Sequence, residues 1–372
     1  MLNKGFVFFL MLVIICGNSS VIAQRHRQPD TTFRVIGFYQ GSFADINKYD
    51  VSKLTHIIFC FTHLSGNRIS MDNDEQERIL KGLVALKKNH PNLRVLISFG
   101  GWGGCETCSE VFSTDKNRHA FATSARTMLL KYKADGLDLD WESPVIGGYK
   151  NHKATGDDKA NFTLLLKELR KTLPPASELC FDANSFDEYL RLSVDWGNAM
   201  PLVDFVNLMT YGLPADAHGQ TGHHSALYSS SYQNESVSKS VEALHALGVP
   251  MDKIIIGAAF YAFVAEHVDS INHGLGRPGT FKCNVNFNRL QETYTERNGY
   301  EYHWDSVAQA PFLYNKQLGI FVTCDDKKSV SLKTRYAIDK KLGGIMFWKL
   351  NGDTYREGLL DAIYQQTTSG KP

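Results

Sequence analysis

The sequence predicts an α/β fold, a (β/α)8 TIM barrel with a small α+β insertion between strands 7 and 8. Short apolar runs alternate with longer amphipathic windows along the chain, which is the pattern of repeated strand–helix units. Eight such runs occur, and 372 residues are enough for one barrel domain. An open doubly wound sheet is the alternative, but no G-x-G-x-x-G phosphate loop follows the first run.

The candidate strands, in chain order, are Arg34–Tyr39, His56–Thr62, Arg94–Ser98, Gly136–Glu142, Leu179–Ala183, Phe205–Tyr211, Ile254–Tyr261 and Gly344–Lys349. Helix-like windows with apolar residues three or four apart lie between them. They are Gln76–Lys88, Asp158–Leu173, Asn234–Leu247 and Ser329–Leu342.

One connection is much longer than the others. About 80 residues separate the seventh and eighth candidate strands, more than a helix and two loops need. The stretch Phe263–Asp326 is rich in aromatic, Asn and Gly residues. We therefore expect a β-rich inserted subdomain at about residues 263–335. It would follow the seventh strand, at the face where barrels hold their active sites.

The N-terminus has the features of an export signal. Lys4 precedes an uncharged apolar run from Phe6 to Cys16, and Ala23 is a small residue suited to cleavage before Gln24. A membrane anchor is the alternative, but the run is shorter than the ~20 residues that span a bilayer. We expect residues 1–23 to be a cleaved signal peptide and residues 24–372 to form one secreted domain, extracellular or periplasmic, with no membrane segment.

Composition and charge narrow the class of protein. The chain is 43% hydrophobic and 21% charged, which predicts a packed globular core. Its formal net charge is +1 and it has no long basic block, so nucleic acid is not an expected partner. Cys105 and Cys108 form a C-x-x-C that export would favour as a disulfide, and no second such pair supports zinc. His223 and His224 are adjacent and point different ways, so they make a poor metal pair.

The most informative stretch is residues 135–142, Asp-Gly-Leu-Asp-Leu-Asp-Trp-Glu. In a strand, Asp138, Asp140 and Glu142 share one face, each about 6.5–7 Å from the next. Carboxylates packed this closely cannot all ionise cheaply, so one keeps its proton near neutral pH. A glycosidic leaving group needs such an acid. A solvated acidic edge strand is disfavoured because Asp is depleted in strands, and a calcium site needs ligands that the sequence does not identify.

The pattern Asp-x-x-Asp-x-Asp-x-Glu resembles the signature of family 18 glycoside hydrolases, the chitinases, in a bacterial-type single-domain form with an inserted α+β subdomain. Other segments are similar to family motifs over most of the chain. They are Leu96–Trp102 with its S-x-G-G, Met209-Thr210-Tyr211, Gly257–Tyr261, Phe321–Lys333 and Gly343–Trp348.

The resemblance implies a substrate-assisted mechanism that retains the β configuration. Glu142 would protonate the glycosidic oxygen, and the 2-acetamido oxygen of the substrate would attack the anomeric carbon. Asp140 would orient the acetamido group, Asp138 would share a proton with Asp140, and Tyr211 would donate to the acetamido oxygen. No metal or organic cofactor is implied.

The resemblance also suggests which residues contact substrate. Trp348 is expected to form the floor under the reacting sugar, because aromatic faces suit the C–H faces of pyranose rings. Trp141 faces away from the acids and is expected in the core. The further candidates for substrate binding are Met209, Tyr39, Tyr261, Trp102, Gly101 and Asp135.

Two positions depart from the family pattern. Gly212 follows Tyr211 where the family often has Asp, and Phe263 stands where it often has Arg. Asp216 is a candidate to replace the missing carboxylate.

The resulting interpretation is a secreted, monomeric chitinase that cleaves β-1,4 linkages in chitin or chito-oligosaccharides. One alternative is a catalytically weak chitin-binding lectin, although such relatives usually lack the acid that Glu142 supplies. The other is an endo-β-N-acetylglucosaminidase that acts on N-glycans and differs in the shape of its cleft.

Overall fold

A computed structural model describes residues 33–150, 152–213 and 219–368. The predicted signal peptide, residues 1–23, and Asp216 lie outside these ranges, so their roles stay predictions. No helix within the described ranges is both long and apolar enough to cross a membrane.

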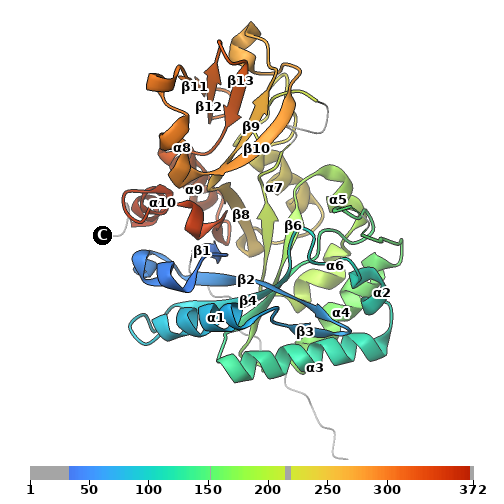
Figure 1. The fold of residues 1–372 in the computed structure, drawn as a ribbon. Helices are drawn as coiled ribbons and strands as arrows, with labels where there is room; N and C mark the ends of the chain where they lie inside the picture. The colour runs from blue at the N-terminus through green and yellow to red at the C-terminus, as the bar shows by residue number, and fades with distance from the viewer. Residues whose placement is uncertain (1–32, 151, 214–218, 369–372) are drawn as a thin grey trace, which may run out of the picture. The chain divides into compact units, whose positions relative to one another are not determined.

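Eight parallel strands form the core of the chain. They are β1 (Arg34–Tyr39), β2 (His56–Ser65), β4 (Arg94–Gly100), β5 (Gly136–Asp140), β6 (Glu178–Asn184), β7 (Phe205–Met209), β8 (Ile254–Ala259) and β14 (Gly344–Trp348). Each pairs with the next, and β1 pairs with both β14 and β2, which closes the ring. Figure 1 labels β1, β2, β4, β6 and β8 of this barrel. The prediction of a (β/α)8 barrel is confirmed. A short strand, β3 (Arg68–Ser70), extends β2 by antiparallel pairing.

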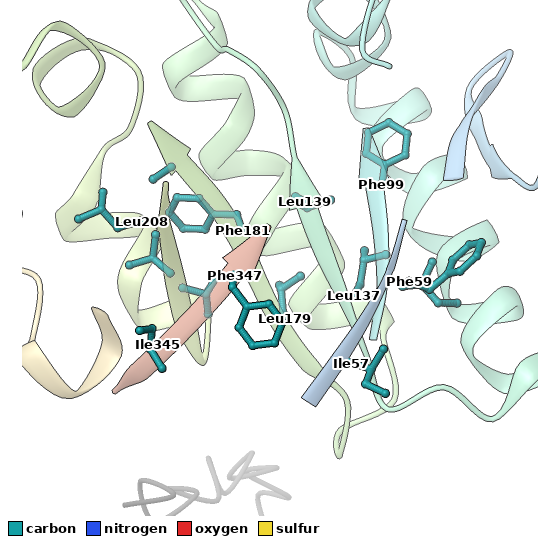
Figure 2. Packing of buried hydrophobic residues seen from close by; sticks show 14 of the residues in the cluster. Ile57, Phe59, Phe99, Leu137, Leu139, Leu179, Phe181, Leu208, Ile345 and Phe347 are labelled. Atoms are coloured by element: carbon teal, nitrogen blue, oxygen red, sulfur yellow. The ribbon is translucent and has the colours of Figure 1, made fainter. Parts of the chain in front are cut away.

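Alternate residues of each strand face two different apolar layers. On β5, Leu137 and Leu139 point outward to the helices, together with Phe99, Phe181 and other side chains (Figure 2). Each such side chain contributes about 1.5–3 kcal/mol when fully buried. The alternate positions fill the barrel interior, where a second cluster contains Ile36, Leu96, Cys180, Phe205, Ile255 and Met346. Asp138 and Asp140 therefore lie on the interior face, as the alternation predicts.

Helices cover the outside of the barrel. They are α1 (Asp74–Leu86), α2 (Cys108–Phe112), α3 (Asp115–Tyr132), α4 (Asp158–Thr172), α5 (Asp187–Leu192), α6 (Trp196–Ala199), α7 (Val237–Ala246), α9 (Lys327–Asp339) and α10 (Leu359–Thr368). Side-chain hydrogen bonds cap the first turn of several of these helices. For example, the Asn73 side chain accepts a hydrogen bond from the Gln76 N–H at the start of α1. The four predicted windows correspond to α1, α4, α7 and α9. Between β1 and β2 the chain forms two short 3-10 helices, η1 (Phe43–Lys48) and η2 (Val51–Lys53).

The insertion forms a five-stranded antiparallel sheet with one helix, α8 (Phe287–Thr293). Its strands are β9 (Tyr261–Glu266), β10 (Thr280–Asn286), β11 (Glu301–Asp305), β12 (Ala310–Asn315) and β13 (Ile320–Thr323), in the spatial order β10-β9-β13-β12-β11. The predicted end near residue 335 is too late. The side chain of Asp326 accepts from the Ser329 N–H in a capping box, and this starts the barrel helix α9 at Lys327.

A buried ion pair ties the end of the insertion to the barrel. Lys333 Nζ lies 2.5 and 2.7 Å from the two carboxylate oxygens of Asp325, and both side chains are fully buried. Asp325 also accepts from the Ala259 N–H of β8 at 2.9 Å, and Lys333 donates to Ser225 Oγ at 2.6 Å. The charges are thus matched and hydrogen-bonded, which is the condition under which a protein tolerates them in its core.

This arrangement predicts a large loss of stability for Lys333→Met. The substitution leaves the Asp325 carboxylate buried without its cation, and we expect a cost of about 3–5 kcal/mol in equilibrium unfolding by urea. Arg335→Met on the exposed face of the same helix is the control, with an expected change within about 0.5 kcal/mol. Equal stabilities of the two variants would contradict the role assigned to the pair.

Candidate active site

A cleft opens at the carboxyl ends of the barrel strands. Its volume is about 1290 Å³, above the ~300–1000 Å³ typical of sites for drug-sized ligands. It therefore has room for a chain of several sugar rings. The final residues of five barrel strands line it: Gly100, Asp140, Asn184, Met209 and Trp348.

The acids of residues 135–142 are layered within the barrel. β5 ends at Asp140, and Glu142 follows in the adjoining loop; both line the cleft. Asp138 lies deeper and is fully buried. It accepts hydrogen bonds from Ser98 Oγ at 2.7 Å and Cys180 Sγ at 3.1 Å, its register partners on β4 and β6, and from Asn207 Nδ2 at 3.3 Å.

Burial controls the protonation of these groups. It raises the pKa of half-buried Glu142 to about 7. The pKa of Asp140 is well above its usual value because of burial and the nearby charges of Glu142 and Asp138. In the part of the chain that the structure describes, no Lys or Arg forms an ion pair with any of these acids. Glu142 can therefore hold a proton near neutral pH and release it within the cleft.

Asp182, on β6, is a fourth acid that the sequence analysis did not single out. It lines the cleft and is 3% exposed. Burial, followed by the charges of Asp138 and Asp140, places its pKa well above the usual value. A hydrogen bond from Asp182 lowers the Asp138 pKa, against the larger effect of burial. The sequence feature that could have identified Asp182 is an acid within the otherwise apolar candidate strand Leu179–Ala183, two residues after Cys180.

Several aromatic side chains line the cleft. Trp348 stacks on Phe61 with ring centroids 5.5 Å apart, so its indole is held at the cleft surface. Tyr211 and Tyr261 meet edge to face at 6.1 Å, and both line the cleft. Trp102 is 64% exposed at the cleft margin, which leaves its face free for a ligand.

Three predicted substrate contacts do not line the cleft. Tyr39 is buried, and its hydroxyl donates to the Ser42 carbonyl oxygen at 2.6 Å. Gly101 lies behind the surface, where its N–H donates to the Asp140 carbonyl oxygen. Asp135 precedes β5 and pairs with Lys87 at 2.6 Å. Because β5 separates Asp135 from Glu142, the two acids lie at opposite ends of the strand.

Other predictions concern residues around this site. Trp141 is buried against Phe112 and Phe162, in the core as expected. Gly212 and Phe263, the two departures from the family pattern, both line the cleft. The structure therefore places an uncharged surface where the family often has Asp and Arg.

The predicted Cys105–Cys108 disulfide is present. His223 and His224 are both buried and have different surroundings. His223 Nε2 lies 3.0 Å from Asp305 Oδ2, whereas the His224 ring packs against Tyr261. They do not converge on a common ligand position.

Comparisons with known proteins agree with this geometry. The family model described as glycosyl hydrolases family 18 matches residues 34–353. Chitinase A1 of Niallia circulans is 27% identical over 94% of this chain and 61% of its own length. This chain thus spans less than two thirds of the length of that relative.

Two solved structures are similar in sequence as well as in fold. Chitinase ChiW from Paenibacillus sp. has a TM-score of 0.83 and 30% identity, covering 91% of this chain and 43% of its own. A family 18 N-acetylglucosaminidase from Paenibacillus barengoltzii has a TM-score of 0.81 and 35% identity, covering 90% of this chain and 100% of its own. The family match extends through both the barrel and the inserted sheet, and the chain belongs to glycoside hydrolase family 18.

Proposed function

We propose that this protein is a chitinase that hydrolyses β-1,4 linkages between N-acetylglucosamine units with retention of configuration. The observation that carries the proposal is Glu142, a carboxyl group with a pKa near 7 in a cleft large enough for several sugar rings. The chitinases among its relatives support the substrate class.

The first chemical step breaks the glycosidic bond. Glu142 gives its proton to the glycosidic oxygen as the bond from that oxygen to the anomeric carbon breaks. The acetamido oxygen of the same sugar forms a new bond to the anomeric carbon, and an oxazolinium ion results. Family 18 enzymes are a known exception to the two-carboxylate rule because the substrate itself supplies this nucleophile.

The second step reverses the first with water. Glu142, now a carboxylate, removes a proton from a water molecule as the water oxygen attacks the anomeric carbon. The bond to the acetamido oxygen breaks, which restores the acetamido group and the protonated Glu142. Two inversions at one carbon give a product of retained β configuration.

Asp140 is the group suited to orient the acetamido group. Its Oδ1 is buried and has no hydrogen-bond partner among the described residues, so it offers an acceptor for the acetamido N–H. In this proposal the substrate supplies the nucleophile, so Asp140 has a positioning role and not a nucleophilic one. Tyr211 would donate to the acetamido oxygen, and Trp348 would support the sugar ring.

The wider context is part of the same proposal. Export through residues 1–23 would bring the enzyme to an insoluble polymer that remains outside the cell. Chitin and its oligosaccharides are the proposed partners, and a monomer is the proposed form. Gly212 has no side chain, so this protein lacks the polar contact that the family often provides from this position.

A second candidate is an N-acetylglucosaminidase that releases single sugars, favoured by the 35% identical Paenibacillus barengoltzii enzyme. The large cleft favours a longer substrate instead. A non-catalytic lectin is disfavoured by the presence of Glu142.

We predict that wild-type protein cleaves chitohexaose to shorter oligomers of β configuration and that Glu142→Gln lowers turnover by at least ~10²-fold, because the amide cannot transfer the proton. Products are identified by mass and by NMR of the anomeric proton. Glu168→Gln on the surface of α4 is the control and should keep full activity. Release of monosaccharide alone would support the second candidate, and undiminished turnover by Glu142→Gln would refute the assignment.

A further prediction concerns pH. Glu142 is protonated below its pKa of about 7, so kcat/KM should fall as pH rises through this value.

A separate prediction concerns the acid side of the pH profile, where protonation of Asp138 should lower activity. Asp182→Ala removes a hydrogen bond that lowers the Asp138 pKa, so this loss of activity should begin at a higher pH than in wild type. Asp182→Asn keeps a donor and should restore the wild-type profile. The same loss of activity at acid pH in Asp182→Ala and wild type would contradict the proposed effect of Asp182 on Asp138.

A further inference from the structure

Two histidines and a glutamate converge on the inserted sheet, at the strand farthest from β10. Glu301 and His303 are two residues apart on β11, so both side chains project from one face of this edge strand. The 3-10 turn η5 (Ile271–Gly274) brings His273 to the same place, with its ring centroid 4.0 Å from that of His303. One ligand atom from each of the three residues lies within 4.8 Å of the others.

We propose that His273, His303 and Glu301 bind a divalent transition metal ion, with Zn²⁺ as the best match. Imidazole nitrogen and carboxylate oxygen are zinc ligands, and three of them leave a fourth tetrahedral position for water. Glu301 Oε2 lies 3.5 Å from His303 Nε2 and 3.9 Å from His273 Nδ1. Tetrahedral bonds of about 2.0–2.2 Å separate ligand atoms by roughly 3.4 Å, close to these two distances. The two rings lie 33° from parallel, so they would have to rotate for both nitrogens to face one ion.

His303 is held ready for such a ligand. Its ring stacks on Phe312, with centroids 5.0 Å apart and planes 24° apart. Its Nε2 is buried, and within the described part of the chain it makes no hydrogen bond of good geometry, since Glu301 Oε2 lies 3.5 Å away. An unsatisfied buried nitrogen calls for an explanation, and a metal ion supplies one.

The backbone that carries His273 is also fixed. The Gly274 carbonyl oxygen accepts a hydrogen bond from Thr221 Oγ1, and Gly274 lies so close to the Tyr314 ring that a Cβ would clash. The turn is therefore anchored at Gly274, the residue that follows His273. A metal here would join η5 to the edge strand β11 and stabilise the insertion, apart from the catalytic cleft.

An ion pair without metal is the rival explanation. The Glu301 side chain is exposed, so solvent screens its pairing with either histidine and the pairing contributes little. The chain offers a matched comparison on its surface. His119 Nδ1 and Glu168 Oε1 lie 2.7 Å apart, but the structure places no second histidine in that pair.

The test is isothermal titration of the full-length protein with ZnCl₂ near neutral pH. We expect saturable binding of one Zn²⁺, weakened at least ~10-fold by either His273→Ala or His303→Ala and unchanged by His119→Ala. Zn²⁺ should also raise the melting temperature of wild type but not of His273→Ala. Because His273 is exposed, that variant should fold even if His303→Ala does not.

Absence of saturable binding, or equal affinity in wild type and His273→Ala, would overturn the proposal. Chitin hydrolysis should continue after zinc is removed with a chelator, so the result does not depend on the proposed catalytic function.

Discussion

The site depends on the burial of four carboxyl groups that are packed together at the end of the barrel. No Lys or Arg of the described chain forms an ion pair with them. Desolvation favours the protonated form, so the protein holds acidic protons at a pH where exposed carboxyls would have lost them. Glu142, nearest the cleft, has a pKa of about 7. Asp138, deepest in the barrel, receives three hydrogen bonds that oppose the effect of burial on its pKa but do not outweigh it.

The fold makes this burial of carboxyl groups possible. Leu137 and Leu139 bind the central acid strand to the helical layer, and apolar residues such as Leu96 and Met346 fill the barrel below the acids. The destabilising burial of charge is thus offset by packing on both faces of the strand. The inserted sheet begins two residues after β8 and contributes Tyr261, Phe263 and Asn284 to the cleft. Strand β9, whose residues line the cleft, therefore follows almost directly from barrel strand β8.

Much of this could be predicted from sequence because strand alternation is a local property. The eight strands and the shared face of Asp138 and Asp140 follow from it. Helix α3 was missed because its buried face includes Ala122 and Ala125 and even Arg118, rather than a row of large apolar residues. Asp135 and Asp182 differ in this respect. Asp135 precedes the first residue of β5, so its place at the opposite end from Glu142 could have been read from the sequence. The acids that Asp182 meets depend on pairing between strands and could not.

The central claim is that one carboxyl group acts with an amide supplied by the substrate. The most direct measurement compares kcat/KM for chitohexaose with kcat/KM for the same oligomer lacking its acetyl groups. The account predicts hydrolysis of the acetylated oligomer and none of the deacetylated one, since only the first carries the nucleophile. Comparable cleavage of both oligomers would contradict it.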